Sequence, residues 1–505
     1  MLLLTALALT LWFWRRNLRD ASLWMVLTYA GVALIAWTDF SAVSVAGGSA
    51  FPKILKDFIM LGMVGFVQAM AVKKQISVWM AVVLIFGMFA AVHYLDELIN
   101  TEDNPASQQI TTQLSAIDDS YLVELAEGAS EDELLNFVIN QQLTAERAFF
   151  PDAASETHLD NYYVVSNPTG DINLQRELDR LGTVVYTEPN ETISLEPFIE
   201  AEELVTASGK RSSLSINDPL TSEQWAMEVL DMDDYYRLLQ EQTPKKKAKV
   251  VILDTGVDGQ HEDLDDNYFS IESQYDDDPH GHGTHCAGVA AGVTNNGLGI
   301  GSLAGTNDES PFVEVSSVKV LNAGGMGTQK TIIAGIIEAT DEGADVISLS
   351  LGGRSNPSSQ RAYSAAVEYA HRNGAIVVAA AGNSNRDAID YAPANAKGMI
   401  TVAAVDQLLL RAPFSNRTDK IAMAIAAPGV GIYSTVPGNG YKSYSGTSMA
   451  CPFVAGLLGV MKSLDPSLDY KQAYRIINRT GRESSETRIT GRIVQPAAAL
   501  AAVLR

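Results

Sequence analysis

The sequence has very few cysteines and a shortage of basic residues. Only two of its 505 residues are cysteine, which is too few for the disulfide framework that stabilises many small secreted domains. Lysine and arginine number 36 against 60 aspartates and glutamates, giving a formal net charge of -24 at pH 7. Because a nucleic-acid partner requires a basic face, this balance excludes nucleic-acid binding as the main function. The chain must be held by hydrophobic cores, and its length predicts about three domains.

Long apolar runs are concentrated before residue 95. Four of them follow one another, at 1–14, 21–37, 57–72 and 76–94. The last is long enough to cross a hydrocarbon core of roughly 30 Å, which takes about 20 helical residues. A secretory signal is the competing interpretation of the first run, but its arginines follow the apolar stretch instead of preceding it. We therefore interpret residues 1–97 as about four membrane spans. The alternative is that the four runs are buried helices of a soluble domain.

Basic residues beside these runs predict an orientation in the membrane. Those expected in the cytoplasm are Arg15, Arg16, Arg19, Lys73 and Lys74, against Lys53 and Lys56 outside. This count places everything after the fourth run outside the cytoplasm, in the periplasm or the extracellular space. Residues 98–118 are polar, contain Pro105 and are typical of a linker.

Residues 119–200 change to short strands alternating with amphipathic helices. Residues 121–125 are strand-like, and Ser130 with Glu133 forms a capping box that opens a helix through Leu143. The second half repeats the scheme, with a strand at 162–165, a helical face of Leu174, Leu178 and Leu181 ended by Gly182, and a strand at 184–187. With one further strand between the halves, the order is strand, helix, strand, strand, helix, strand, which is ferredoxin-like.

Residues 217–505 alternate between apolar runs and helical segments, as in a doubly wound parallel sheet of the α/β class. The runs predicted as strands are 250–253, 315–321, 346–351, 376–380 and 400–405. They are largely apolar, which is typical of strands buried on both faces. Two helices are predicted at 331–342 and 358–373, each ended by a glycine, Gly343 or Gly374. Functional groups gather past the C-terminal ends of such strands, where Asp254, Ser350 and Asn383 lie.

Four motifs in this part carry side chains suited to nucleophilic catalysis. They are Leu-Asp-Thr-Gly-Val-Asp at 253–258, His-Gly-Thr-His-Cys-Ala-Gly at 282–288, Ala-Ala-Gly-Asn at 380–383 and Ser-Gly-Thr-Ser-Met-Ala-Cys-Pro at 445–452. In these motifs, and in the chain order Asp, His, Ser, the sequence resembles the subtilisin (S8) family of serine proteases, particularly its branch with a cysteine after His-Gly-Thr-His. Each residue alone has an ordinary structural interpretation, so the inference depends on all four motifs together.

The resemblance implies a catalytic role for each motif. His282 is the base that takes the proton of Ser448 and later protonates the leaving amine. Asp254 orients the imidazole, and Asn383 is a donor to the oxyanion. Ser448 is expected at the start of an apolar helix with Pro452 in its first turn. The implied reaction is peptide-bond hydrolysis through an acyl-enzyme, with no catalytic cofactor.

The resemblance also implies a cleft that binds peptides by β-augmentation. Ser350, Leu351 and Gly352 match the strand on one side of the substrate, and a segment containing Gly325 and Gly327 matches the other side. Such pairing recognises backbone, so broad specificity is expected. Residues 391–394 match a wall of the primary pocket. The aspartates at 276–278 either favour basic residues near the scissile bond or form a solvated acidic loop.

Structural Ca²⁺ is the one cofactor that the resemblance implies. Its ligands would be Asp218, Asp263 and Asn296, together with backbone carbonyls of the loop around Asn296, an oxygen-rich set of the kind Ca²⁺ prefers. Cys286 and Cys451 are expected to be reduced core residues on helices beneath the site, and His285 is expected to be structural.

Together these features predict a membrane-anchored serine endopeptidase made as a zymogen. Residues 119–200 resemble the inhibitor-type propeptide of the family, with a generic α+β spacer as the alternative. Residues 201–216 are expected to be a processing linker, with self-cleavage between about 198 and 217.

Expected partners are protein or peptide substrates, membrane lipid and the chain's own propeptide, with no nucleic acid. The alternative functions are a catalytically silent membrane receptor or scaffold with a peptide-binding protease-like domain, and a transport or sensing role for the spans.

Overall fold

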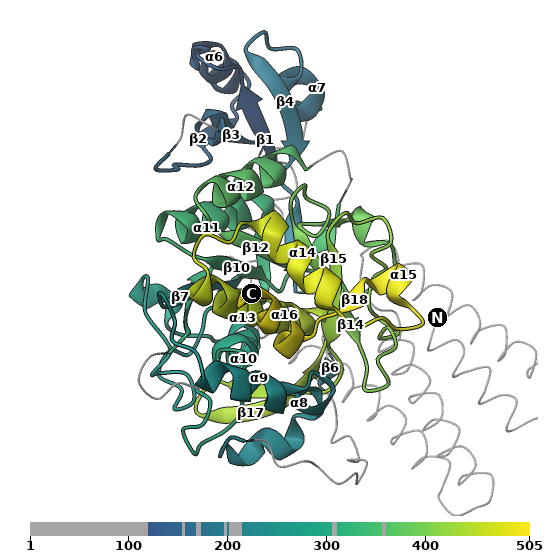
Figure 1. The fold of residues 1–505 in the computed structure, drawn as a ribbon. Coiled ribbons are helices and arrows are strands. Elements are labelled where there is room, and N and C mark those ends of the chain that lie inside the picture. Colours follow the sequence, from purple (N-terminus) through teal and green to yellow (C-terminus); the bar gives the residue numbers. More distant parts are fainter. Residues whose placement is uncertain are drawn as a thin grey trace, which may run out of the picture. The chain divides into compact units, whose positions relative to one another are not determined.

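The computed structural model describes residues 120–153, 157–167, 173–195, 199–200, 215–305, 311–355 and 360–505 (Figure 1). The predicted membrane spans, the linker at 98–118 and most of the linker at 201–216 lie outside these residues. Within the described part, one helix, α13 (Thr447–Leu464), is long and apolar enough to cross a membrane, but its whole length is buried inside the protein. In this structure α13 is a core helix.

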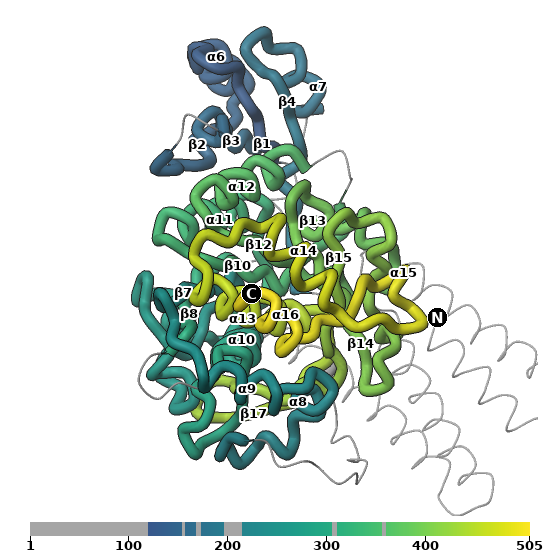
Figure 2. The backbone as a smooth tube through the Cα atoms, in the orientation of Figure 1, coloured from purple at the N-terminus to yellow at the C-terminus, as the bar shows by residue number. Residues whose placement is uncertain are grey.

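A seven-stranded parallel sheet is the centre of residues 215–505, and Figure 2 traces the path of its strands. Its spatial order is β18-β15-β14-β12-β10-β7-β8. The five predicted strands are β7 (Ala248–Asp254), β8 (Val313–Lys319), β10 (Val346–Leu349), β12 (Ile376–Ala380) and β14 (Ile400–Val405). The sequence did not predict β15 (Ala424–Pro428) and β18 (Arg492–Ile493), which extend the sheet at one edge.

Successive side chains of each strand face two different helical layers. In β7, Val250 and Ile252 pack in one buried cluster with α10 (His282–Ala291) and α13, whereas Val251 and Leu253 pack in another with α11 (Gln329–Asp341) and α12 (Arg361–Arg372) (Figure 1). Each such buried side chain contributes roughly 1.5–3 kcal/mol of hydrophobic stabilisation. The doubly wound arrangement is therefore confirmed.

Further short elements complete this part of the chain. They are α8 (Trp225–Val229), α9 (Met232–Gln240), β16 (Ile432–Val436), β17 (Gly440–Ser445), α14 (Tyr470–Thr480), α15 (Thr487–Thr490) and α16 (Pro496–Val503). The two predicted helix ends are also present, because Gly343 after α11 and Gly374 after α12 have φ of 76° and 89°. Only glycine adopts such left-handed backbone readily.

Residues 120–189 form a separate antiparallel sheet with two helices. The chain order is β1 (Ser120–Leu125), α6 (Asp132–Asn140), β2 (Thr144–Arg147), β3 (Tyr162–Ser166), α7 (Leu174–Leu178) and β4 (Val184–Pro189), and the spatial order is β2-β3-β1-β4. We call this part the small unit. Its own core contains apolar side chains from both helices and the sheet, among them Leu134, Leu178 and Val165.

Two local predictions in the small unit are wrong. Glu133 does not close a capping box, because its carboxylate accepts hydrogen bonds from the N–H groups of Gly182 (3.1 Å) and Thr183 (2.9 Å). The second helix stops at Leu178, before the expected Leu181 and Gly182, because the chain turns there with a bond from Leu181 N–H to the Leu178 carbonyl. Glu133 thus joins α6 to the turn that leads into β4.

The small unit packs against the starts of α11 and α12. The buried carboxylate of Glu188 accepts hydrogen bonds from the N–H groups of Arg361 and Ala362 (3.1 Å each) and from Nε2 of Gln329 (2.8 Å). The Arg361 side chain also pairs with Glu124 at 2.7 Å. The first N–H groups of a helix lack partners within it and favour an anion, so Glu188 satisfies donors that α12 cannot satisfy itself. Burial raises the pKa of Glu188 to about 7.

Candidate active site

Asp254 and His282 form a buried pair at the C-terminal edge of the parallel sheet. Asp254 is the last residue of β7 and His282 is the first residue of α10. Nδ1 of His282 lies 2.9 Å from both carboxylate oxygens of Asp254, and both side chains are fully buried. Burial lowers the pKa of His282, but the Asp254 carboxylate outweighs this effect and holds that pKa well above the ordinary 6.5. The pair is therefore built to stabilise a protonated imidazole.

Asp278 fixes the start of the helix that carries His282, a role that the sequence did not reveal. Its carboxylate accepts bonds from the N–H groups of Gly281 and Thr284 (2.8 Å each) and from Oγ1 of Thr255 (2.7 Å). An aspartate placed before a helix, with threonine at the third helical position, was the available signal. Asp278 is a positioning residue, because its bonds hold both α10 and the residue after Asp254.

The aspartate run at 276–278 is only partly solvated. Asp278 is buried, with 5% of its surface exposed. Asp277 pairs with Lys319 at 2.6 Å, and Asp276 accepts from the hydroxyl of Tyr268 at 2.7 Å. All three carboxylates have partners within the chain, although the Asp277 side chain is 72% exposed. An effect of this run on basic substrate residues stays a prediction.

Ser448 is the second residue of α13 and contacts both neighbouring motifs. Its hydroxyl donates to the carbonyl oxygen of Ser350 at 3.0 Å. Sγ of Cys286 lies 3.5 Å from the carbonyl oxygen of Ser448 and 4.0 Å from Nδ1 of His282. Pro452 is the sixth residue of α13, so the prediction that it lies in the first turn is wrong. The structure brings the serine, the histidine and the aspartate to one edge of the sheet.

Asn383 lies beside the turn that starts α13. It follows β12 by three residues, and its Oδ1 accepts bonds from the N–H and the hydroxyl of Thr447 (2.8 Å each). A Cβ atom placed on Gly446 would lie 3.3 Å from Nδ2 of Asn383 and 3.7 Å from the backbone nitrogen of Ser448. Nδ2 of Asn383 and the backbone nitrogen of Ser448 therefore lie on the same side of Gly446, at the nucleophile turn.

The predicted substrate cleft contains a segment of this chain. Strand β5 (Thr192–Ser194) pairs antiparallel with β9 (Met326–Thr328), with Ile193 opposite Gly327. On its other side, Ser194 forms a bridge with Gly352. The predicted substrate residue Leu351 is buried and belongs to the same apolar cluster as Ile193. Both sides of the predicted cleft thus accept an extended strand.

The described residues on either side of 196–198 pair with the cleft and with the strand before the nucleophile. Leu195 N–H donates to the carbonyl oxygen of Gly325 at 2.8 Å. Farther along, β6 (Ile199–Glu200) pairs with β17, with Ile199 opposite Ser445. Ser445 lies three residues before Ser448 in the chain. The peptide bonds between Leu195 and Ile199 therefore connect the cleft strands to the strand that leads into the nucleophile turn.

The predicted calcium ligands are close together, and the two aspartates are buried, whereas Asn296 is exposed. Asn296 donates through Nδ2 to Asp263 at 3.0 Å, and its N–H donates to Asp218 at 3.1 Å. Burial raises the pKa of Asp218 to about 6 and that of Asp263 to about 7, and the charge of Asp218 adds to the second shift. The Asn296 amide oxygen accepts from the N–H of Leu298 at 2.8 Å. Two buried carboxylates without a basic side chain among these contacts provide oxygen ligands of the kind that a hard cation such as Ca²⁺ prefers.

The remaining predicted residues have structural surroundings. Cys286 and Cys451 are free, buried thiols on α10 and α13. Nε2 of His285 lies 3.0 Å from the carbonyl oxygen of Ile432, and burial lowers the pKa of His285 to about 3. His285 is neutral at physiological pH, which agrees with the expected structural role.

Comparison with known proteins agrees with this geometry. The sequence model of the Subtilase family (Peptidase_S8) matches residues 245–493. Thermitase from Thermoactinomyces vulgaris is 45% identical over 221 residues, which cover 43% of this chain and 75% of thermitase. Subtilisin DY from Bacillus licheniformis is 41% identical over 241 residues, covering 46% and 83% of the two chains. The solved structure of a protease from Pseudoalteromonas arctica has a TM-score of 0.50 and 30% identity, covering 57% of this chain and 99% of its own.

Proposed function

The chain belongs to the subtilase family and is a serine endopeptidase, and from this premise we propose that Asp254, His282 and Ser448 are its catalytic triad. The observation that carries the proposal is the buried contact of 2.9 Å between Nδ1 of His282 and both oxygens of Asp254. This contact leaves Nε2 as the ring atom that can exchange a proton with Ser448.

Each step of peptide hydrolysis has a residue in this arrangement. The Ser448 hydroxyl turns away from the Ser350 carbonyl, gives its proton to Nε2 of His282, and its oxygen bonds to the substrate carbonyl carbon. The carbonyl oxygen becomes an oxyanion that accepts from Nδ2 of Asn383 and the N–H of Ser448. When the peptide C–N bond breaks, His282 protonates the amine, and Asp254 stabilises the imidazolium in between. Water then releases the acyl group, with His282 again acting as the base.

We further propose that residues 119–200 are a ferredoxin-like inhibitory propeptide. The strand order of the small unit and the anion that Glu188 presents to α12 support this assignment. So does β5, which occupies the cleft where a substrate strand would pair. Because β5 pairs in the cleft and Ile199 pairs with Ser445, three residues before Ser448, we propose the self-cleavage between residues 195 and 199. This segment begins just before the range of about 198 to 217 expected from the sequence, and the predicted linker at 201–216 follows it.

Two further parts of the proposal concern the anchor and the metal. The four apolar runs of residues 1–97 support a multi-span membrane anchor with the peptidase outside the cytoplasm, held against membrane lipid. Asp218, Asp263 and Asn296 would hold a Ca²⁺ ion, which would offset the buried negative charge and tie the segment at 218 to the loop at 295–300. The metal would have a structural function, and no step of hydrolysis uses it.

Mass spectrometry of the mature N-terminus tests the activity and the processing together. We expect the full chain to yield a fragment that begins between residues 196 and 199, and the Ser448→Ala variant to remain uncut and associated with membranes. The same fragment from the Ser448→Ala chain would show that another enzyme makes the cut. An exposed serine on a helix end, changed in Ser222→Ala, is the matched control and should be processed like the parent.

A further inference from the structure

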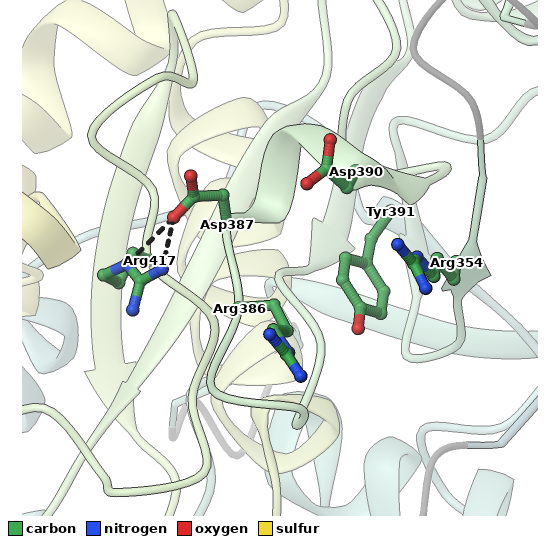
Figure 3. A pocket seen from close by; sticks show the side chains of 6 residues that line it. All are labelled: Arg354, Arg386, Asp387, Asp390, Tyr391 and Arg417. Atoms are coloured by element: carbon green, nitrogen blue, oxygen red, sulfur yellow. Dashed lines mark hydrogen bonds and ion pairs between the residues drawn. The ribbon is translucent and has the colours of Figure 1, made fainter.

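A cavity of about 260 Å³ beside the candidate active site is lined mainly by charged side chains (Figure 3). The lining residues are Arg354, Arg386, Asp387, Asp390, Tyr391 and Arg417. Three arginines in one small cavity are unusual in a chain whose net charge is -24. The cavity therefore carries three positive side chains against two negative ones.

Two walls of the cavity continue directly from the active site. Arg354 lies two residues beyond Gly352, in β11 (Gly353–Arg354), which pairs with β13 (Tyr391–Ala392) so that Arg354 is opposite Tyr391. Arg386 follows Asn383 by three residues, and its N–H donates to the side chain of Asn416 at 2.8 Å. Three residues span at most roughly 11 Å, so both arginine backbones lie near the cleft.

The cavity retains positive charge after its internal ion pairs are made. Asp387 pairs with Lys420 and with Arg417 (2.6 Å), and these two cations hold the pKa of Asp387 below its ordinary value. Within the residues that the structure describes, Arg354 and Arg386 take part in no salt bridge, and both are exposed. Only Asp390 remains to oppose their two charges. The guanidinium groups are thus available to an anionic ligand.

We propose that this cavity is a specificity pocket in which Arg354 and Arg386 bind the carboxylate of an acidic substrate side chain. The inference rests on the proposed function, because it assumes that the cleft of β9 and Gly352 holds the substrate. A guanidinium binds a carboxylate through paired N–H donors, and the largely buried ring of Tyr391 gives the side-chain stem an apolar surface.

The test compares two fluorogenic peptides, Thr-Ile-Ser-Leu-Glu and Thr-Ile-Ser-Leu-Gln, each linked to a reporter amine. We expect the processed enzyme to prefer the glutamate peptide by roughly tenfold or more in kcat/KM, as for a charge-assisted hydrogen bond. The preference should decline at high ionic strength. In the double variant Arg354→Gln/Arg386→Gln the ratio should approach one, and in Arg386→Glu the glutamate-to-glutamine ratio should fall below that of the parent. Arg475→Gln, which removes an exposed arginine outside the cavity, should keep the parent ratio.

The outcomes separate this inference from the proposed function. If the parent cleaves both peptides equally well, the specificity pocket is overturned while the peptidase stands. A glutamate preference that persists in the folded double variant also overturns it, and labelling of Ser448 by a fluorophosphonate establishes that the variant is folded. If the parent cleaves neither peptide and is not labelled, the proposed function itself fails. If the variants do not fold, the parent alone tests the inference: a ratio of kcat/KM for the glutamate over the glutamine peptide of roughly tenfold or more supports the pocket, and a ratio near one overturns it.

Discussion

Ser350 and Ser448 exchange two hydrogen bonds. The Ser448 hydroxyl donates to the Ser350 carbonyl oxygen at 3.0 Å, and the Ser350 hydroxyl donates to the Ser448 carbonyl oxygen at 2.8 Å. The second bond exists because Pro452, four residues after Ser448 in α13, has no N–H to offer that carbonyl. Pro452 thus leaves the Ser448 carbonyl oxygen free to accept from Ser350. This bond connects the strand end that is predicted to bind substrate to the nucleophile turn.

We expect Ser350→Ala to lower kcat about fivefold with little change in KM. The variant keeps the backbone that pairs with substrate but removes a donor worth about 1 kcal/mol from the Ser448 carbonyl. Steady-state kinetics on one peptide measures both constants. Adding Pro452→Ala supplies an N–H to the same carbonyl and should recover part of the loss. An unchanged kcat in Ser350→Ala would show that this bond does not position the nucleophile.

The Asn383→Leu variant tests the oxyanion site. Losing one donor of this kind typically lowers kcat by roughly 10²–10³-fold, and KM should change little because the donor acts on the transition state. Asn385→Gly, two residues along the same loop, is the control, because Asn385 has φ of 53° and glycine tolerates that backbone. A loss confined to KM in Asn383→Leu would place the amide in ground-state binding instead.

The pH profile of kcat/KM should follow the charge of His282. The imidazole must be neutral to act as a base, and Asp254 holds its pKa above 6.5, so activity should be absent at low pH and appear above 6.5. In Asp254→Asn the carboxylate that raises the pKa of His282 is gone, while burial still lowers that pKa. The acidic limb should then move to lower pH, and the plateau should fall by roughly 10⁴-fold. An acidic limb that keeps its position would mean that another group controls the profile.

Removal of calcium should destabilise the peptidase without changing its chemistry. A ligand at a hundredfold excess over its Kd stabilises by about 2.7 kcal/mol, which corresponds to roughly 5–10 °C in Tm for a domain of this size. We expect a chelator to lower the Tm of the parent by this amount and to have little effect on Asp263→Asn. The control is Asp265→Asn, an exposed neighbour that should respond like the parent. An identical Tm in calcium and chelator would contradict the site.

The sequence predicted the sheet and the edge of the active site well, because both depend on local patterns. Apolar runs such as 376–380 mark strands buried on both faces, and a polar residue after such a run is placed at the functional edge by topology alone. Asp254 and Asn383 lie there as expected. The outer strands β15 and β18 were missed because one is rich in alanine and the other has only two residues.

The interactions that hold the site in place were less predictable. Glu133 has the spacing of a capping box, but the turn at 182–183 supplies stronger partners that are distant in the chain. Asp278 looked like part of an acidic loop because nothing in its local sequence shows that Thr255 lies beside it. Tertiary contacts decide such cases, and a single sequence does not record them.

Mapping the site of covalent labelling tests the catalytic assignment most directly. The processed enzyme is treated with a fluorophosphonate and digested, and the modified residue is located by mass spectrometry. The account predicts an adduct on Ser448 that is lost in His282→Ala, because the hydroxyl reacts only when a base removes its proton. An adduct on a different residue of an active preparation, or full reaction of Ser448 without His282, would contradict it.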